Sequence, residues 1–185
     1  MIRMLRVERE IEHLAGNILN LSLHLRNSKS RGASWANVFT FAESCTGGLL
    51  ASSMTSLPGV SAVFPGSVVT YSNRAKTEHL SVAPETIERH GAVSPQCAAE
   101  MAAGALGMFG AAMAVSVTGI AGPDGGSGGK PVGTVWFAIA HHNGKMKLKR
   151  GFYPGRPRRG VQRMAVLAAL ALLADGLRYE IGMLT

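Results

Sequence analysis

Near the start of the chain, apolar side chains recur at steps of three and four residues: Val7, Ile11, Leu14, Ile18, Leu21 and Leu25. This spacing predicts an amphipathic helix over residues 5–26 with one apolar stripe. The stripe has to pack on this chain's own sheet or on another subunit, and we expect the intramolecular packing. Residues 27–36 are polar, basic and glycine-containing, which predicts a loop.

Short apolar runs predict five strands in the rest of the chain, over residues 38–42, 67–71, 112–118, 132–142 and 145–153. Asn143 and Gly144 join the last two runs, and this dipeptide is a strong signal for a tight antiparallel hairpin. The run at 112–118 is apolar at nearly every position, as in strands that are buried on both faces. The sheet is therefore expected to be mixed.

Capping residues and periodicity place helices between these strands. The helices cover the stretch from Gly48 to Met54, a short segment capped by Asn73, another bracketed by Pro84 and Gly91, a longer one from Ser94 to Gly110, and residues 159–177. The alternation of helices and strands predicts an α/β fold. It is expected to be a three-layer α/β/α sandwich with a mixed, mostly parallel sheet of about five strands.

Composition favours one domain. With 185 residues, 46% of them hydrophobic and 16% charged, the chain can bury one substantial core but is too short for two ordinary domains. We therefore predict a single domain overall. In it, an N-terminal helix and basic loop (residues 1–36) pack on the domain formed by residues 37–185.

The formal net charge of +8 suits nucleic acid or an anionic small molecule. The basic residues are concentrated in 1–31 and 145–163, where they form either a solvated surface or a rim that attracts phosphate. Aromatic residues make up only 6% of the chain and do not alternate with basic ones. We therefore rank nucleic-acid binding last.

Nothing in the sequence indicates export or membrane insertion. Charged residues interrupt the N-terminal segment, which leaves no apolar core for a secretory signal. The longest apolar run, residues 164–174, has 11 residues, whereas about 20 are needed to cross a bilayer, so it predicts a core helix. Cys45 and Cys97 are too few and too far apart for a disulfide framework, and we expect a cytoplasmic protein.

The string AESCTGG at 42–48 places reactive side chains between a predicted strand and a predicted helix. Backbone N–H groups at a helix start favour an oxyanion or a phosphate, and a hydroxyl at the same place is a candidate nucleophile. The candidate nucleophile is Ser44, and the candidate anion binders are Thr46, Gly47 and Gly48. For an isolated motif of this kind, a simple helix cap is the commoner outcome.

A second strand-to-helix junction lies at 70–76, where Tyr71 ends a strand and Lys76 lies in the first turn of a helix. The helix dipole and any burial disfavour a charged lysine there, so we expect its pKa to fall. A neutral Lys76 can take the proton from Ser44, and Tyr71 can relay a proton or hydrogen-bond the nucleophile. On spacing alone, a solvated surface lysine is the commoner outcome.

Seven glycines crowd into the 17 residues 118–134, just beyond a buried strand. Glycines let backbone N–H groups approach a ligand, and ligands of open α/β sheets bind at such strand ends. The candidate substrate-binding residues are Thr118, Gly119, Gly122, Gly125, Gly126 and Lys130. The segment is no Walker A loop, because Pro131 follows the lysine. A flexible surface loop is the alternative.

Other chemistry has weaker support. Cys45 is a rival nucleophile, because a thiol at a helix N-terminus has a lowered pKa. Ser44 does not lie in a GxSxG elbow. We predict no metal site, since zinc-type spacing is lacking among His79, His90, His141 and His142.

Five strings in order resemble the CinA C-terminal domain family of competence/damage-inducible proteins: AESCTGG at 42–48, VTYSNRAK at 69–76, HGAVS at 90–94, TGIAGPDGG at 118–126 and KPVGTV at 130–135. The resemblance covers residues 39–153. It implies a three-layer α/β/α sandwich. It also implies the activity of the family's stand-alone nicotinamide-nucleotide amidases, which hydrolyse nicotinamide mononucleotide to nicotinate mononucleotide and ammonia.

By this resemblance, Ser44 takes the nucleophile position, Lys76 the general-base position and Tyr71 the position of an assisting hydroxyl. The implied mechanism is attack of Ser44 on the carboxamide carbon, release of ammonia and hydrolysis of the acyl-enzyme, in the recycling of pyridine nucleotides. No cofactor or metal is implied. The expected partner is the small-molecule substrate, and the expected assembly is a homo-oligomer.

The sequence departs from the family pattern in two places. The segment 156–159 is strongly basic where the family often carries an acidic residue, and residues 28–35 resemble an insertion before the first strand. We also expect the N-terminal nucleotide-hydrolase domain of longer members to be absent. The alternative function is a non-catalytic nucleotide-binding or interaction module of the same family.

Overall fold

Helices and strands alternate along the chain in the computed structural model, which describes residues 2–28 and 36–183. The elements are α1 (Ile2–Asn27), β1 (Phe39–Glu43), α2 (Leu49–Thr55), the 3-10 helix η2 (Val60–Ala62), β2 (Ser67–Val69), α3 (Asn73–Leu80), α4 (Pro84–His90), α5 (Pro95–Phe109), β3 (Met113–Gly119), β4 (Thr134–His141), β5 (Met146–Phe152) and α6 (Arg158–Gly182). Every predicted helix and strand is present, with ends shifted by a few residues. The loop predicted at 27–36 and the insertion at 28–35 lie mostly outside the described residues.

The sheet has the order β2-β1-β3-β4-β5. Strand β1 pairs in parallel with β2 and β3, whereas β4 pairs antiparallel with β3 and β5. Four strands therefore run in one direction and only β4 runs against them, which confirms the mixed, mostly parallel sheet. Because β1, β2, β3 and β5 share a direction, their carboxyl ends lie at one edge.

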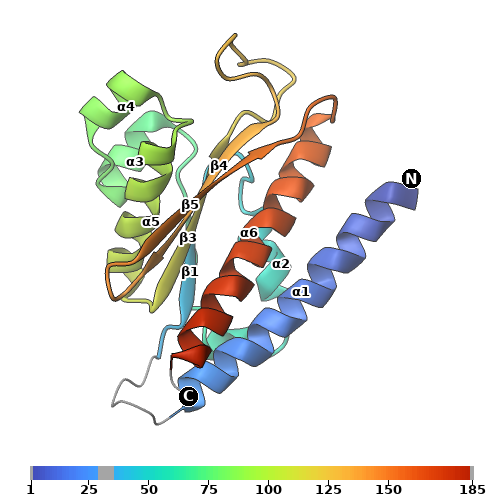
Figure 1. The fold of residues 1–185 in the computed structure, drawn as a ribbon, viewed down its shortest axis with the longest axis vertical. Helices are drawn as coiled ribbons and strands as arrows, with labels where there is room; N and C mark the ends of the chain where they lie inside the picture. Colours follow the sequence, from blue (N-terminus) through green and yellow to red (C-terminus); the bar gives the residue numbers. More distant parts are fainter. Residues whose placement is uncertain (1, 29–35, 184–185) are drawn as a thin grey trace.

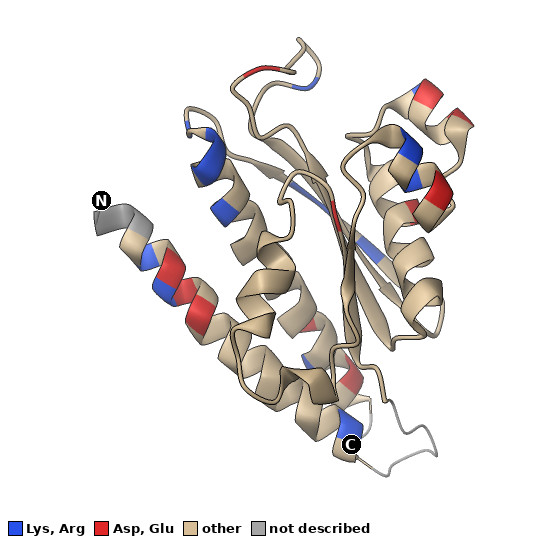
Figure 2. Ribbon diagram, turned by 180° about the vertical axis from the view of Figure 1, so that it is seen from behind, with Lys and Arg blue, Asp and Glu red and all other residues tan. Residues whose placement is uncertain are grey.

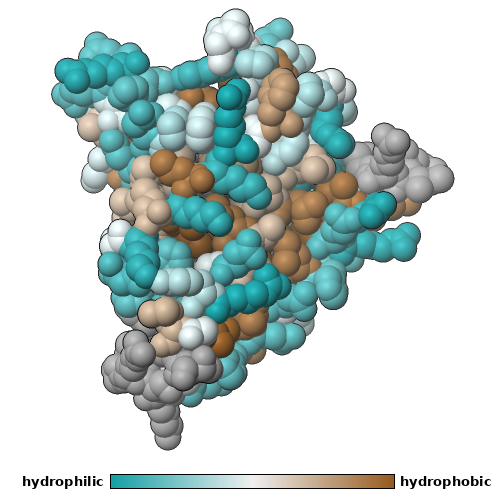
Figure 3. Space-filling model, viewed as in Figure 1, coloured by the Kyte–Doolittle hydropathy of each residue, from teal (hydrophilic) through white to brown (hydrophobic). Residues whose placement is uncertain are grey.

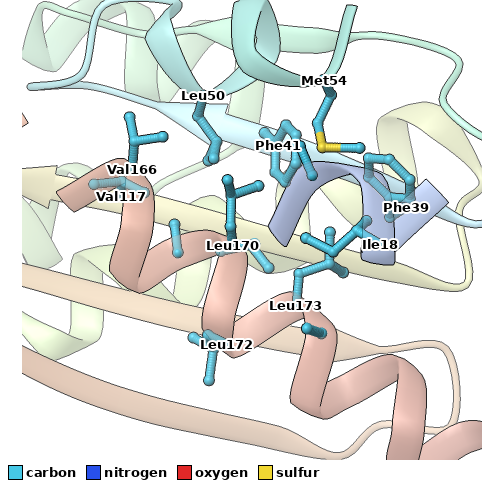
Figure 4. Packing of buried hydrophobic residues seen from close by; sticks show 14 of the residues in the cluster. Ile18, Phe39, Phe41, Leu50, Met54, Val117, Val166, Leu170, Leu172 and Leu173 are labelled. Carbon is cyan, nitrogen blue, oxygen red and sulfur yellow. The ribbon is translucent and has the colours of Figure 1, made fainter. Parts of the chain in front are cut away.

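Helices cover both faces of the sheet and complete the three predicted layers (Figure 1). The helices α1, α2 and α6 lie on one face, and α3, α4 and α5 lie on the other. Side chains alternate along β1, so Phe39 and Phe41 pack in the cluster with α2 and α6 (Figure 4), while Ala42 packs against α5. Both phenylalanines are fully buried. We expect Phe41→Ala to cost about 3–5 kcal/mol of stability.

The N-terminal helix packs against the C-terminal helix of the same chain. Its buried residues Ile11, Ala15 and Ile18 belong to the main core cluster, so the predicted stripe packs within this chain, mainly on α6. Helix α6 is long and apolar enough to cross a membrane by length and composition alone. However, 56% of its most apolar window is buried inside the fold, as expected for a core helix.

Strand β5 forms one edge of the sheet and is exposed at most positions. Its exposed apolar residues are Met146, Leu148 and Phe152, and they alternate with Lys147 and Lys149. Apolar and polar atoms are interleaved on the face that carries β5 and α6 (Figure 3). Lysines on an edge strand disfavour pairing with further strands.

One predicted cap is wrong. Ser72, and not Asn73, precedes α3, and its hydroxyl accepts a hydrogen bond from the Ala75 N–H at 3.1 Å. Asn73 is instead the first helical residue. Strand β2 also ends at Val69, before the predicted end at residue 71, because the chain turns there toward α3.

Candidate active site

Ser44 lies directly beyond β1, at the sheet edge where the parallel strands end. Its N–H donates to the Val117 carbonyl at 2.9 Å, which continues the pairing of β1 with β3. By the alternation along β1, its side chain faces α3 and α5. Gly47 and Gly48 follow with positive φ angles of 62° and 97°, and these allow the sharp turn into α2.

The start of α2 is occupied by Glu43, the last residue of β1. Its buried carboxylate accepts hydrogen bonds from the N–H groups of Gly48, Leu50 and Ala51 at 2.9, 3.1 and 2.8 Å. The sequence analysis did not single out this residue. A glutamate followed five residues later by a helix N-cap, Gly48, was the available signal, since carboxylates favour helix N-termini.

Two of the predicted anion binders already have acceptors within the turn. The Gly48 N–H donates to Glu43, and the Gly47 N–H donates to the Ser44 carbonyl at 3.1 Å, so neither N–H is free for an oxyanion or a phosphate in this structure. For the N–H groups of Cys45 and Thr46, the described residues provide no acceptor in another residue. The buried Thr46 hydroxyl also has no partner in the described part of the chain.

Lys76 reaches Ser44 from α3, across the sheet edge. Its Nζ lies 3.0 Å from the Ser44 Oγ, 2.7 Å from the Thr70 carbonyl oxygen and 3.4 Å from the Tyr71 carbonyl oxygen. The side chain is only 1% exposed, and this burial lowers the pKa of Lys76 below its ordinary value. A neutral amine has two hydrogens for the two carbonyls, which leaves its lone pair for the Ser44 hydroxyl proton.

Tyr71 and Arg158 form a second pair beside the dyad. The Arg158 guanidinium donates to the Tyr71 hydroxyl at 2.6 Å and to the Gly122 carbonyl at 2.7 Å. Basic residues gather at the start of α6, where Arg158 is the first residue (Figure 2). The Tyr71 hydroxyl is thus hydrogen-bonded to a cation, while the residue's backbone carbonyl contacts Lys76.

Sequence reasoning placed Arg158 only in a basic segment and gave it no contact. The signal that could have found it is strand direction. Because β5 runs parallel to β1, the chain that leaves β5 arrives at the same sheet edge as Ser44. A cation soon after β5 is therefore brought to the site.

These residues surround a cleft of about 270 Å³. Of the predicted site residues, the cleft brings together Ser44, Tyr71, Lys76, Thr118, Gly119, Gly122 and Gly125. Cys45, Asn73, Asp124 and Arg158 also line it, and the last three were not among the predicted site residues. The Thr118 hydroxyl donates to the Ala92 carbonyl at 2.8 Å, which fixes one wall. The remaining predicted residues, Thr46, Gly47, Gly48, Gly126 and Lys130, do not line this cleft.

Lys130 lies in a different cavity because the glycine-rich segment folds back on itself. Ser127 and Lys130 form an antiparallel bridge, and the Lys130 Nζ donates to the His90 carbonyl. Gly126 packs so closely that an added Cβ would lie 2.9 Å from the Val132 nitrogen. Lys130 therefore does not line the cleft beside Ser44, and its contact with a substrate stays a prediction.

Cys45 has the opposite electrostatics from those expected of a reactive thiol. Burial raises the pKa of Cys45 to about 12, and the nearby Glu43 carboxylate adds to the rise. The expected lowering is wrong chiefly because the thiol is buried, and the Glu43 carboxylate at the start of α2 adds to the effect. At neutral pH the Cys45 thiol is therefore protonated, which disfavours it as the rival nucleophile.

No group of three His, Cys, Asp or Glu side chains is arranged to hold a metal ion within residues 2–28 and 36–183. The two cysteines are both free and buried.

The sequence of the chain is similar to those of known proteins. A family model described as the CinA C-terminal domain matches residues 28–177. Over 145 residues the chain is 50% identical to the nicotinamide-nucleotide amidohydrolase PncC of Escherichia coli K12, which covers 78% of this chain and 85% of the relative.

Two further relatives extend the comparison. A CinA-like protein of Fervidobacterium nodosum is 50% identical over 139 residues, which are 75% of this chain but 33% of the relative, so the chain spans about a third of that protein's length. The crystal structure of the competence/damage inducible protein CihA from Agrobacterium tumefaciens superposes with a TM-score of 0.81 at 40% identity. That superposition covers 91% of this chain and 96% of the other.

Proposed function

The chain belongs to the CinA C-terminal domain family, and from this membership we propose that it is a nicotinamide-nucleotide amidase that uses Ser44 as nucleophile. It converts nicotinamide mononucleotide to nicotinate mononucleotide and ammonia, in the recycling of pyridine nucleotides. The observation that carries the proposal is the 3.0 Å contact between a buried Lys76 Nζ and the Ser44 Oγ. The name of the relative from E. coli supports the choice of substrate.

In the first step, neutral Lys76 accepts the Ser44 hydroxyl proton while the Oγ attacks the carboxamide carbon. The carbonyl oxygen becomes an oxyanion, and the N–H group of Cys45, which lines the cleft, is the donor that the turn leaves for it. Protonated Lys76 then gives its proton to the departing nitrogen, which leaves as ammonia. Lys76 next takes a proton from a water molecule whose oxygen attacks the acyl carbon. The ester bond to the Ser44 Oγ then breaks, the carboxylate product leaves, and Lys76 returns the proton to the Oγ.

Arg158 is the cation that can hold the substrate's phosphate. A guanidinium has five N–H donors, and the contacts with Tyr71 and Gly122 use two of them. The remaining donors suit a phosphate oxygen. Asn73 and Asp124 also line the cleft and provide polar groups for ribose hydroxyls.

Release of ammonia from nicotinamide mononucleotide tests this function, with the nucleotide product identified by chromatography. Nicotinamide riboside, which lacks the phosphate, is the matched substrate and should react far more slowly. If the protein binds the mononucleotide but releases no ammonia over a broad pH range, the non-catalytic binding module replaces the amidase. Assembly as a homo-oligomer and location in the cytoplasm stay predictions.

A further inference from the structure

A second cavity of about 300 Å³ lies beside the catalytic cleft. It is bounded by the start of α5, the first residues of β4, Arg150 of β5 and the end of the glycine-rich segment. Val93 lines both cavities, so the two share a wall. This cavity holds Lys130, the predicted ligand-binding residue that the catalytic cleft leaves out.

The lining of the cavity is cationic. Lys130 and Arg150 both line it, together with His90, and no aspartate or glutamate lines it. The Lys130 Nζ is held by the His90 carbonyl, and the Arg150 guanidinium lies over the Trp136 ring, 6.0 Å from its centroid. Neither cation forms an ion pair with a carboxylate of the described residues.

Helix α5 points its N-terminus into this cavity through Ser94, Pro95 and Gln96. The Ser94 hydroxyl caps the Cys97 N–H at 3.1 Å, and Pro95 has no N–H to offer. The Gln96 N–H has no acceptor in the described part of the chain. The first turn contains no acidic residue, so the positive end of this 15-residue helix is not compensated as α2 is by Glu43.

Thr134 supplies an independent indication of a ligand. This residue lines the cavity, is 1% exposed, and its hydroxyl has no hydrogen-bond partner among the described residues. It lies on the same face of β4 as Trp136, which also lines the cavity, because residues two apart share a face. A buried hydroxyl normally has a partner, and an oxygen of a ligand in this cavity would supply one.

We propose that this cavity is a second anion site, which binds a phosphate group separately from the catalytic cleft. The Lys130 ammonium and the Arg150 guanidinium neutralise the phosphate, while the Gln96 N–H and the Thr134 hydroxyl donate to its oxygens. The group is either free phosphate or the phosphate of a nucleotide, since both present the same oxygens. Because Val93 is shared, a bound phosphate also supports one wall of the catalytic cleft.

The test is calorimetric titration with inorganic phosphate, on protein that carries Arg158→Gln so that the catalytic cleft contributes little. We expect one phosphate per chain, bound at least tenfold more weakly when Arg150→Gln or Lys130→Gln is added. Lys149→Gln is the matched control, because Lys149 is an exposed cation on the same strand that does not line the cavity. Titration with adenosine monophosphate distinguishes the sources, since tighter binding than inorganic phosphate identifies a nucleotide.

Unchanged affinity in both Arg150→Gln and Lys130→Gln would overturn the proposal, as would an equal loss in Lys149→Gln. Arg150→Gln keeps the test valid if Lys130→Gln fails to fold, because Arg150 is exposed on an edge strand. The inference does not rest on the amidase function. A protein without ammonia release can still bind phosphate here, and an active amidase can lack the site.

Discussion

Two strand-to-helix turns meet at the same sheet edge, and they are built differently. The turn from β1 to α2 carries Ser44 and fills its own helix start with the Glu43 carboxylate. The turn from β2 to α3 is capped by the neutral hydroxyl of Ser72 and carries Lys76 into the interior. The first turn is fixed by three charge-assisted hydrogen bonds, while the second supplies an amine whose neutral, proton-accepting form is favoured by burial.

The difference shows where the reactivity of Ser44 comes from. The start of α2 gives no field to the nucleophile, because a carboxylate with the opposite charge occupies it. Activation of Ser44 comes instead from Lys76, because a buried amine loses its proton at a lower pH and can then accept the proton of the Ser44 hydroxyl. The turn from β1 to α2 therefore positions Ser44, and the turn from β2 to α3 supplies the amine that can accept its proton.

The largest effect is expected from removing the base. Lys76→Met keeps the apolar stem of the side chain but leaves no group to accept the Ser44 proton, so the rate of ammonia release should fall by about 100-fold to 10,000-fold. The substitution removes the hydrogen bonds to the Thr70 and Tyr71 carbonyls but also the cost of burying the amine, so the free energy of unfolding should change by less than about 1 kcal/mol. Activity assays and urea denaturation measure the two quantities. A variant that unfolds but keeps its activity per folded molecule would contradict the role of Lys76.

The pH dependence comes next in size. Neutral Lys76 is the active form, so the rate should rise about tenfold per pH unit until its lowered pKa is passed, at a pH below the ordinary lysine value of about 10.4. Stability should change in the same direction. Between the lowered pKa and about 10.4 the unfolded chain binds more protons than the folded one, so the free energy of unfolding rises with pH.

A rate that falls as the pH rises toward the lowered pKa of Lys76 would contradict a neutral amine as the base. Lys76→Met is the control for the stability measurement, since it should lack the rise that Lys76 causes.

The two helix starts should respond unequally to loss of their caps. Glu43→Ala leaves three N–H groups without a partner and should lower the free energy of unfolding by about 3 kcal/mol. Ser72→Ala removes one exposed neutral cap and should cost about 1 kcal/mol. Urea denaturation of both variants measures the difference. Equal costs would show that the carboxylate does not hold the turn.

The smallest effect is expected at Cys45. Its thiol stays protonated because its pKa is raised to about 12, so Cys45→Ser should change the rate of ammonia release by less than about threefold. Thiol-alkylating reagents should also react slowly with the folded protein at neutral pH. Rapid inactivation by such a reagent, with substrate slowing the inactivation, would indicate that Cys45 is reactive and lies where the substrate binds, which would contradict this prediction.

The order of the strands and the mixed sheet could be predicted from the sequence. Which backbone N–H groups at the helix starts already have an acceptor within the chain could not. The hydrophobic runs gave the strands in order, and the helix starts placed Ser44 and Lys76 at one edge. Local spacing did not reveal that Glu43 turns back to bind Gly48, because a side chain and a phosphate satisfy the same N–H group equally well.

Contacts between residues far apart in the sequence also could not be predicted from the hydrophobic pattern or from local motifs. Arg158 reaches Gly122 across 36 positions of sequence, and the glycine-rich segment folds back so that Lys130 leaves the cleft. Both depend on how a loop closes in space. Composition cannot fix such closure, and the resemblance to the family located the motifs without locating these contacts.

The most direct test of the central claim is the rate of ammonia release from nicotinamide mononucleotide by Ser44→Ala, measured beside Cys45→Ser. The account predicts that Ser44→Ala loses at least about 1,000-fold, since no other group in the cleft is activated by Lys76. Cys45→Ser should remain close to the unmodified protein. Turnover by a folded Ser44→Ala at the rate of the unmodified protein would contradict the account.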